Sequence, residues 1–157
     1  MLSESARATL WLKTFGFVRV PLIWQSGVSV VEISDEHIEI KIPLKRKTKN
    51  HLNSMYFGAL AIGADVAGGA LAVFQIKKLG VNVSFVFKDL HADFLKRADG
   101  DTHFRCNAGA ALTKLVNKAV ETGERVNETV EIVATVPSKY GQEPVAKFTT
   151  TLSLKKV

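Results

Sequence analysis

Alternation of apolar and polar positions predicts several amphipathic strands. Residues 37–42 alternate most strictly, because three isoleucines share one face while a glutamate and a lysine share the other. Residues 28–33 form a second strand, joined to the first by a tight turn at 34–36. Further extended segments are expected at 81–87, 89–97, 102–107, 125–136 and 144–155.

Helical spacing of apolar residues predicts three helices. Residues 3–14 form a short amphipathic helix, and residues 110–121 form another that ends before Gly123 as its C-cap. The third covers the apolar run 55–76, which is long enough to cross a membrane. Asp65 lies in its middle, where a charge costs about 2.5–3.5 kcal/mol on insertion scales. We therefore expect no membrane span, and a helix that is wrapped by its own protein.

This order of elements predicts an α+β fold in a single domain over residues 1–157. Runs of consecutive strands favour an antiparallel β-sheet, which would wrap around the one long central α-helix. A short N-terminal helix and an extra short helix between strands, at 110–121, complete the expected fold. The long helix is apolar on nearly every side, so we expect a second copy of the subunit to cover its remaining face.

The charge is unevenly distributed. The chain has 157 residues and a net charge of +6, which favours anionic partners. Five basic residues, Lys45, Arg46 and Lys47 among them, lie within 41–50, a window without an acidic residue. Since helix N-termini bind anions, this loop is either a phosphate site or a solvated strand end. The chain has no nucleic-acid-binding motif, so we expect no nucleic-acid partner.

Three polar residues are candidates for chemistry. A buried carboxylate at Asp65 can serve as a base, a nucleophile or a structural anchor. Asn50 either directs a side-chain N–H at an oxyanion or makes the turn into the helix. His51 either binds a phosphate, acts as a base or is simply exposed. We expect no metal site, because no histidine or cysteine cluster has ligand spacing.

The cellular setting follows from two features. The single cysteine, Cys106, excludes an intramolecular disulfide, and the first residues lack the pattern of a signal peptide. We expect a reduced, cytoplasmic protein.

The stretch from Asn50 to Asp65 (NHLNSMYFGALAIGAD) resembles the active-site segment of hotdog-fold acyl-CoA thioesterases of the phenylacetic-acid-degradation type. Their pattern is Asn, five residues, His-Gly-Gly, and an Asp seven residues after the last Gly. Tyr56-Phe57-Gly58 stands in the place of His-Gly-Gly. Residues 94–98 (FLKRA) resemble the Phe-Leu-Arg-Pro-Ala strand of that family. The whole chain is most similar to the branch known as DUF4442, and the likeness covers most of residues 28–155.

The resemblance implies a hotdog fold and a homodimer or dimer of dimers, with each site at a subunit interface. Asp65 would activate water or attack the thioester carbonyl across the interface. The backbone N–H groups near Phe57 and Gly58, with the Asn50 side chain, would polarise that carbonyl. The substrate would be an acyl-CoA, with no cofactor besides the coenzyme A that it carries. Its phosphates and pantetheine would meet the residues His51, Tyr56, Lys45, Arg46, Lys47, Lys96 and Arg97.

The departures from the family pattern leave alternatives open. Tyr56 replaces the family His, and Phe57 replaces the first Gly. The backbone N–H that would serve as oxyanion donor is kept when Gly is replaced by Phe, but the larger side chains of Tyr56 and Phe57 would narrow the acyl or pantetheine channel. A protein of the same fold that binds an acyl-CoA or acyl carrier without cleaving it is therefore the main alternative to a thioesterase. A third alternative is a dehydratase or hydratase of this fold, which needs a His paired with an acid. His51 and Asp65 are the only nearby pair, and helical spacing does not clearly bring them together.

Overall fold

A computed structural model describes residues 2–157. Its elements, in chain order, are α1 (Glu4–Arg19), α2 (Pro21–Gln25), β1 (Ser29–Ile33), β2 (Ile38–Ile42), α3 (Phe57–Leu79), β3 (Val83–Phe94), β4 (Thr102–Cys106), α4 (Gly109–Thr122), β5 (Val126–Thr135), α5 (Pro137–Tyr140) and β6 (Pro144–Lys156).

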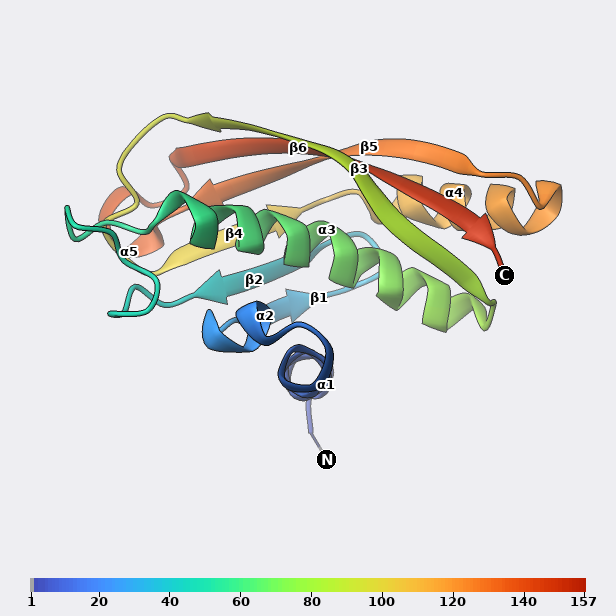
Figure 1. Ribbon diagram of the computed structural model, residues 1–157, viewed down its shortest axis with the longest axis horizontal. Helices are drawn as coiled ribbons and strands as arrows, with labels where there is room; N and C mark the ends of the chain where they lie inside the picture. The colour runs from blue at the N-terminus through green and yellow to red at the C-terminus, as the bar shows by residue number, and fades with distance from the viewer. Residues whose placement is uncertain (1) are drawn as a thin grey trace.

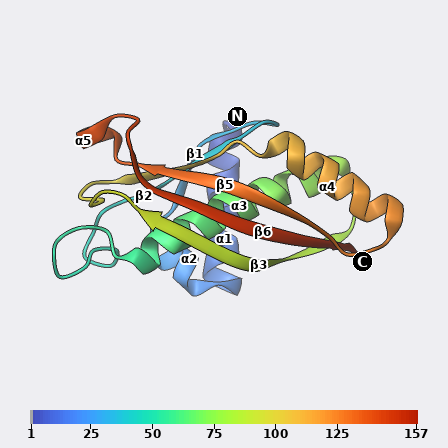
Figure 2. The same cartoon turned by 90° about the horizontal axis from the view of Figure 1, so that it is seen from above.

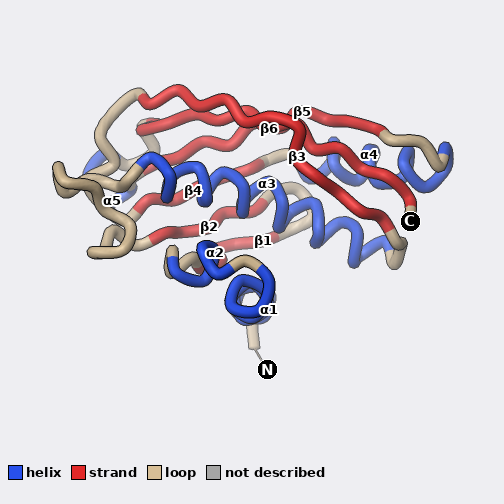
Figure 3. Tube along the Cα trace, in the orientation of Figure 1, coloured by secondary structure: helices blue, strands red, loops and turns tan. Residues whose placement is uncertain are grey.

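The strands form one sheet in the order β1-β2-β4-β5-β6-β3, and every neighbouring pair is antiparallel. The sheet curves around α3, which lies along its concave face (Figure 1). Figure 3 shows the same layers by secondary structure, with the extra helix α4 at one end of the sheet. The predicted antiparallel sheet around one long helix is confirmed.

Alternation in β2 determines which face of the sheet meets α3. Ile38, Ile40 and Ile42 are fully buried, while the residues between them are only partly buried. Close contact with α3 depends on Gly63, because a Cβ there would overlap the ring of Phe104 on β4. The helix ends at Gly80, whose φ of +65° suits glycine and whose N–H donates to the carbonyls of Ile76 and Lys77.

Helix α3 is, within residues 2–157, the one helix long and apolar enough to cross a membrane. However, 56% of its most apolar window is buried inside the protein. The helix is thus the core helix of the fold, in line with the interpretation of Asp65 given above.

The N-terminal region differs most from the prediction. Helix α1 continues to Arg19, and the unpredicted α2 begins at Pro21, whose fixed φ ends one helix and starts the next. Figure 1 shows both helices beside α3, on the side of β1. Part of the α3 face that a second copy was expected to cover is therefore covered by the chain itself.

Strand β3 occupies a free edge of the sheet, as Figure 2 shows. It joins the two extended segments expected at 81–87 and 89–97, with a bulge between Phe87 and Asp89. Val86, Leu90 and Phe94 are about half exposed on this strand, at 54%, 46% and 53%. Lys88, Asp89, His91 and Asp93 are exposed between them, so the edge mixes apolar and charged side chains. A long, unpaired edge is a surface on which a second strand can add.

Candidate functional site

A hollow of about 590 Å³ opens at the start of α3, between residues 50–57 and the end of β3 with the segment after it. We call it the helix-start pocket. Six residues that the sequence analysis assigned to the site line it: Asn50, His51, Tyr56, Phe57, Lys96 and Arg97. The chain folds these two distant segments together through a hydrogen bond of 2.7 Å from the Met55 N–H to the Ala98 carbonyl.

Asn50 uses one half of its side-chain amide to shape the pocket. Its Oδ1 accepts hydrogen bonds from the N–H groups of Leu52 and Ser54, at 2.9 and 3.2 Å. The turn into the helix that the sequence allowed is therefore present. The Nδ2 group makes no hydrogen bond within residues 2–157, so its two N–H groups can still donate to a ligand.

The first N–H groups of α3 are free donors. No side chain among residues 2–157 caps the helix, and the Tyr56 N–H donates instead to the Thr48 carbonyl at 2.8 Å. The N–H groups of Phe57 and Gly58 have no acceptor in the described part of the chain. Free N–H groups and the helix dipole favour negative charge at this point, as a developing oxyanion requires.

Two aromatic rings stand at the mouth of the pocket. Tyr56 is 49% exposed and Phe57 61% exposed, with their ring centroids 4.9 Å apart. The Tyr56 ring packs so closely on Gly58 that a Cβ at this position would overlap it. Phe57 also contacts Phe94 of β3 edge-on, at 6.4 Å between centroids. The rings border the free N–H groups and narrow the approach to them.

The two cations after β3 already have partners. Arg97 donates from its guanidinium to the Leu52 carbonyl and to Ser54 Oγ, which holds the loop over the pocket. Lys96 pairs with Glu143 at 2.8 Å and lies over the ring of Tyr140. Both keep their positive charge at the pocket, but part of their hydrogen-bonding capacity is in use.

Lys45, Arg46 and Lys47 are exposed in the loop before α3 and do not line the pocket. The bridge between Lys49 and Met55 holds this loop against the start of the helix. Lys47 extends toward α2, with Nζ 5.7 Å from the ring centroid of Trp24. The basic loop therefore borders the pocket rather than forming its wall.

Asp65 lies elsewhere, more than two helical turns and about 12 Å along α3 from Phe57. Its cavity of about 230 Å³ lies between α1, α2 and α3 and is otherwise apolar. Burial raises the pKa of Asp65, and no hydrogen bond or ion pair from residues 2–157 offsets this. One subunit thus separates the carboxylate from the oxyanion donors and from His51.

Sequence reasoning missed the residues that enclose Asp65. Trp11 and Phe15 of α1 stack at 5.4 Å between centroids, and both line its cavity with Phe85 of β3. The spacing of four residues between the two aromatics is the one local signal that they share a helix face.

Two further kinds of functional group are the potential metal ligands of residues 2–157 and the single thiol. Residues 2–157 hold no cluster of three or more potential metal ligands. Burial raises the pKa of the Cys106 thiol to about 11, so it stays protonated at neutral pH and is a poor nucleophile.

The model of one protein family, "Domain of unknown function (DUF4442)", matches residues 9–154. No curated protein matches the chain. Among solved structures, one similar to this chain is a protein of unknown function from Pseudomonas aeruginosa that is described as a probable thioesterase. The two chains are 21% identical, with a TM-score of 0.78, and the alignment covers 95% of this chain and 96% of that one.

A protein of unknown function from Chlorobaculum tepidum is 14% identical, with a TM-score of 0.83 and coverage of 98% and 97%. A thioesterase from Haemophilus influenzae is 13% identical, with a TM-score of 0.68 and coverage of 99% and 92%. At such identities the likeness shows the shared fold.

Proposed function

This chain belongs to the DUF4442 family, and from that premise we propose that it is an acyl-CoA thioesterase, which hydrolyses a thioester to a free acid and coenzyme A. One observation carries the proposal. The N–H groups of Phe57 and Gly58 at the start of α3 have no acceptor within residues 2–157, Phe57 and Asn50 line the same pocket, and the Asp65 carboxylate, also without a partner there, lies farther along the helix. The similar structures described as thioesterases support it.

The chemistry needs both groups. The thioester carbonyl oxygen would accept hydrogen bonds from the free N–H groups, which stabilise the negative charge of the tetrahedral intermediate. The Asp65 carboxylate would take a proton from water as the water oxygen bonds to the carbonyl carbon, or attack that carbon itself. Collapse of the intermediate breaks the C–S bond, and the thiolate of coenzyme A leaves; it takes up the proton that Asp65 removed from water, or a proton from solvent when Asp65 itself attacks. In the second case water then hydrolyses the anhydride between Asp65 and the acyl group, which releases the free acid and restores the carboxylate.

A second copy of the chain would bring the two groups together. Antiparallel pairing of two β3 edges about a two-fold axis places the Phe94 end of one strand beside the Phe85 end of the other. Phe94 lines the helix-start pocket, whereas Phe85 lines the cavity of Asp65. Each complete site would then take its N–H donors from one subunit and its carboxylate from the other, in a homodimer or a dimer of dimers.

The basic loop would hold the phosphates of coenzyme A. Lys45, Arg46 and Lys47 are exposed next to the helix-start pocket, and Lys96 and Arg97 add charge on its other side. His51 is exposed at the pocket without a hydrogen-bond partner in residues 2–157, so it can meet the same anion. No separate cofactor is needed, and one buried thiol suits a reduced, cytoplasmic setting.

Release of thiol from a panel of short, long and aryl acyl-CoA esters tests this function. We expect turnover above a buffer control for at least one class of ester. A binding titration with the same esters accompanies the assay. If no ester is cleaved and none is bound, the site does not act on acyl-CoA.

The second candidate is a protein that binds an acyl-CoA or acyl carrier without cleaving it. The packing of the Tyr56 ring on Gly58 favours it, because the ring borders the oxyanion donors. Thioesterases of the phenylacetic-acid-degradation type have His-Gly-Gly at this place. Saturable binding of an acyl-CoA without thiol release above the control would establish this alternative.

A further inference from the structure

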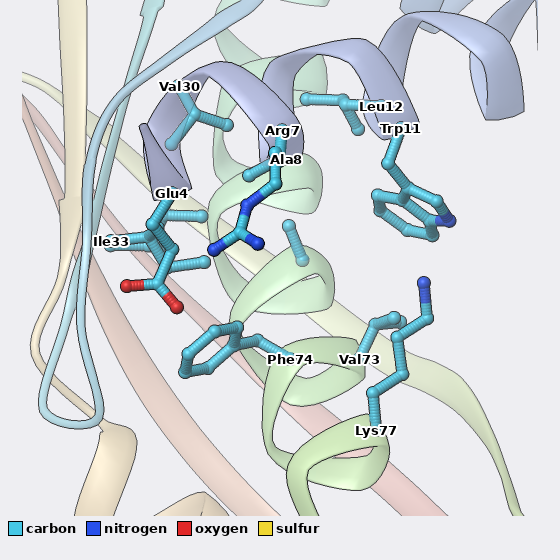
Figure 4. Close-up of a pocket in the computed structure, with 12 residues that line it drawn as sticks. Glu4, Arg7, Ala8, Trp11, Leu12, Val30, Ile33, Val73, Phe74 and Lys77 are labelled. Carbon is cyan, nitrogen blue, oxygen red and sulfur yellow. The ribbon is translucent and has the colours of Figure 1, made fainter. Parts of the chain in front are cut away.

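A second apolar cavity, of about 240 Å³, lies beside the cavity of Asp65, and the two share the lining residues Trp11, Leu12, Ala70 and Val73. We call the combined space the α1 compartment. Figure 4 shows its outer half, where α1 crosses α3 with Trp11 and Leu12 on one side and Val73 and Phe74 on the other. The compartment therefore runs along α3, from Asp65 toward the end of the helix.

The hollow has an identifiable cause in the sequence. The residues of α3 that line it, at positions 65, 66, 69, 70, 73, 74 and 77, follow helical spacing and form one face. Gly69 and Ala70 occupy the middle of that face; the rings of Phe85 and Phe87 lie over Gly69, and the short side chain of Ala70 leaves space toward α1. Helix α1 is held in place as the opposite wall, because the Val30 N–H of β1 donates to Thr9 Oγ1 at 2.9 Å.

Apart from Asp65 at the inner end, the charged side chains of the compartment stand at its far end. Glu4, Arg7 and Lys77 line the outer cavity, and Lys77 Nζ lies 4.2 Å from the ring centroid of Trp11. In Figure 4, Arg7 extends from α1 toward α3, and Lys77 rises from α3 toward the indole. The compartment thus has a carboxylate at one end, an apolar middle and a charged, open rim at the other end.

We propose that the α1 compartment receives the acyl chain of the thioester, with the carbonyl end at Asp65 and the tail beneath Trp11 toward Phe74. The inference rests on the proposed function and names its substrate class as unbranched aliphatic acyl groups of medium length. The rise from Asp65 to Val73 is about 12 Å, roughly the reach of a ten-carbon chain. A longer tail reaches the charged rim and gains no further apolar contact.

The test measures binding without catalysis. S-alkyl-CoA thioethers, from ethyl to dodecyl, cannot be hydrolysed, and calorimetry gives their affinities for each variant. For the unmodified protein we expect affinity to rise about two- to fourfold per methylene up to roughly ten carbons, and then to level off. Val73→Phe places a larger side chain in the compartment, and the matched control Val31→Phe makes the same change at an exposed position of β1.

We expect Val73→Phe to bind S-decyl-CoA at least tenfold more weakly and S-ethyl-CoA within twofold of the unmodified protein, while Val31→Phe keeps the original profile. Two results would overturn the proposal that the compartment receives the acyl chain. One is that the affinities of the two variants depend on chain length in the same way, and the other is that the affinity of the unmodified protein does not depend on chain length. Chain-length-dependent binding without any thiol release from the corresponding esters would overturn the proposed hydrolysis and leave the compartment standing.

Discussion

The helix-start pocket and the α1 compartment lie along the same helix but differ in their polar groups: the pocket presents hydrogen-bond donors, and the compartment presents a carboxylate. The pocket has free N–H donors and positive charge, and no carboxylate belongs to its lining. The compartment has one carboxylate at its inner end and otherwise apolar walls up to the rim. Loop residues and the start of α3 supply most of the pocket's lining, whereas α1 and α3 supply most of the compartment's, together with residues of β1, β2 and β3.

This difference shows what one subunit lacks. Stabilising an oxyanion and activating water require donors and a base within hydrogen-bond reach of the same carbonyl group. The two groups are about 12 Å apart along α3, so a single chain cannot apply both to one thioester. Residues of β3 line both hollows, and its exposed edge is where the proposed pairing of two chains would combine them.

Removal of the carboxylate from the compartment has the largest expected effect. Asp65→Asn keeps the shape of the side chain but cannot accept a proton from water. We expect kcat/KM for thiol release to fall about 10²–10⁴-fold, the range for loss of a general base, with an unchanged circular dichroism spectrum. Glu124→Gln, an exposed acid after α4, is the matched control. Equal activity in Asp65→Asn and Glu124→Gln would remove Asp65 from the mechanism.

Removal of a donor from the pocket has the next largest effect. Asn50→Asp keeps the Oδ1 acceptor for the N–H groups of Leu52 and Ser54 but loses the amide donor. We expect kcat to fall about 10²-fold, as for other single oxyanion donors, with little change in Tm. If kcat is unchanged, Asn50 only stabilises the loop through the hydrogen bonds of its Oδ1 and does not donate to the oxyanion.

Neutralising the basic loop tests binding rather than chemistry. The combined change of Lys45, Arg46 and Lys47 to alanine should raise KM for acyl-CoA about five- to tenfold at low salt, since exposed pairs contribute roughly 0.2–1 kcal/mol each. We expect kcat to stay the same and the effect to shrink as salt is added. Replacing three other exposed lysines, Lys114 and Lys118 of α4 and Lys156 of β6, removes the same charge and provides the control. A KM shift of the same size in that control would assign the effect to net charge.

The smallest effect concerns stability and pH. Burial raises the pKa of Asp65 above its unfolded value of 3.8, so the folded state binds more protons than the unfolded state at pH values between 3.8 and the folded-state pKa. The free energy of unfolding therefore falls as the pH rises through this range. Asp65→Asn should therefore unfold at a higher Tm than the unmodified protein at pH 7. The gap should close near pH 3.8 and below. A lower Tm for Asp65→Asn at pH 7 would indicate a stabilising partner for the carboxylate.

The sequence predicted the parts of the fold that depend on local pattern. Strict alternation identified β2, the apolar run identified α3, and Gly123 marked the end of α4 at a φ of +68°. Asp65 could be recognised as a partly buried carboxylate because it is the one charge within a run that must be wrapped by protein. The two interpretations of Asn50 also proved compatible, since its oxygen makes the turn while its N–H groups stay free.

The α1 compartment was beyond sequence reasoning. Helix α1 has no single apolar face, because Leu10, Phe17 and Val18 are exposed on it while Leu12 is buried. Its contact with α3 joins residues some sixty positions apart in the chain, and no local pattern encodes that distance. The size of a cavity also depends on the side chains of every element around it. Here these include Gly69 and Ala70 of α3 and the α1 residues Trp11 and Leu12 opposite them.

Mixed dimers test the central claim, that each site takes its carboxylate from one subunit and its donors from the other. Asp65→Asn and Asn50→Asp subunits are each inactive in this account, and their heterodimer regains one intact site. Random mixing should therefore restore about one quarter of the unmodified specific activity, since half of the dimers then carry one working site of two. Activity no higher than the average of the two separate variants, in a sample shown to contain heterodimers, would contradict the shared site.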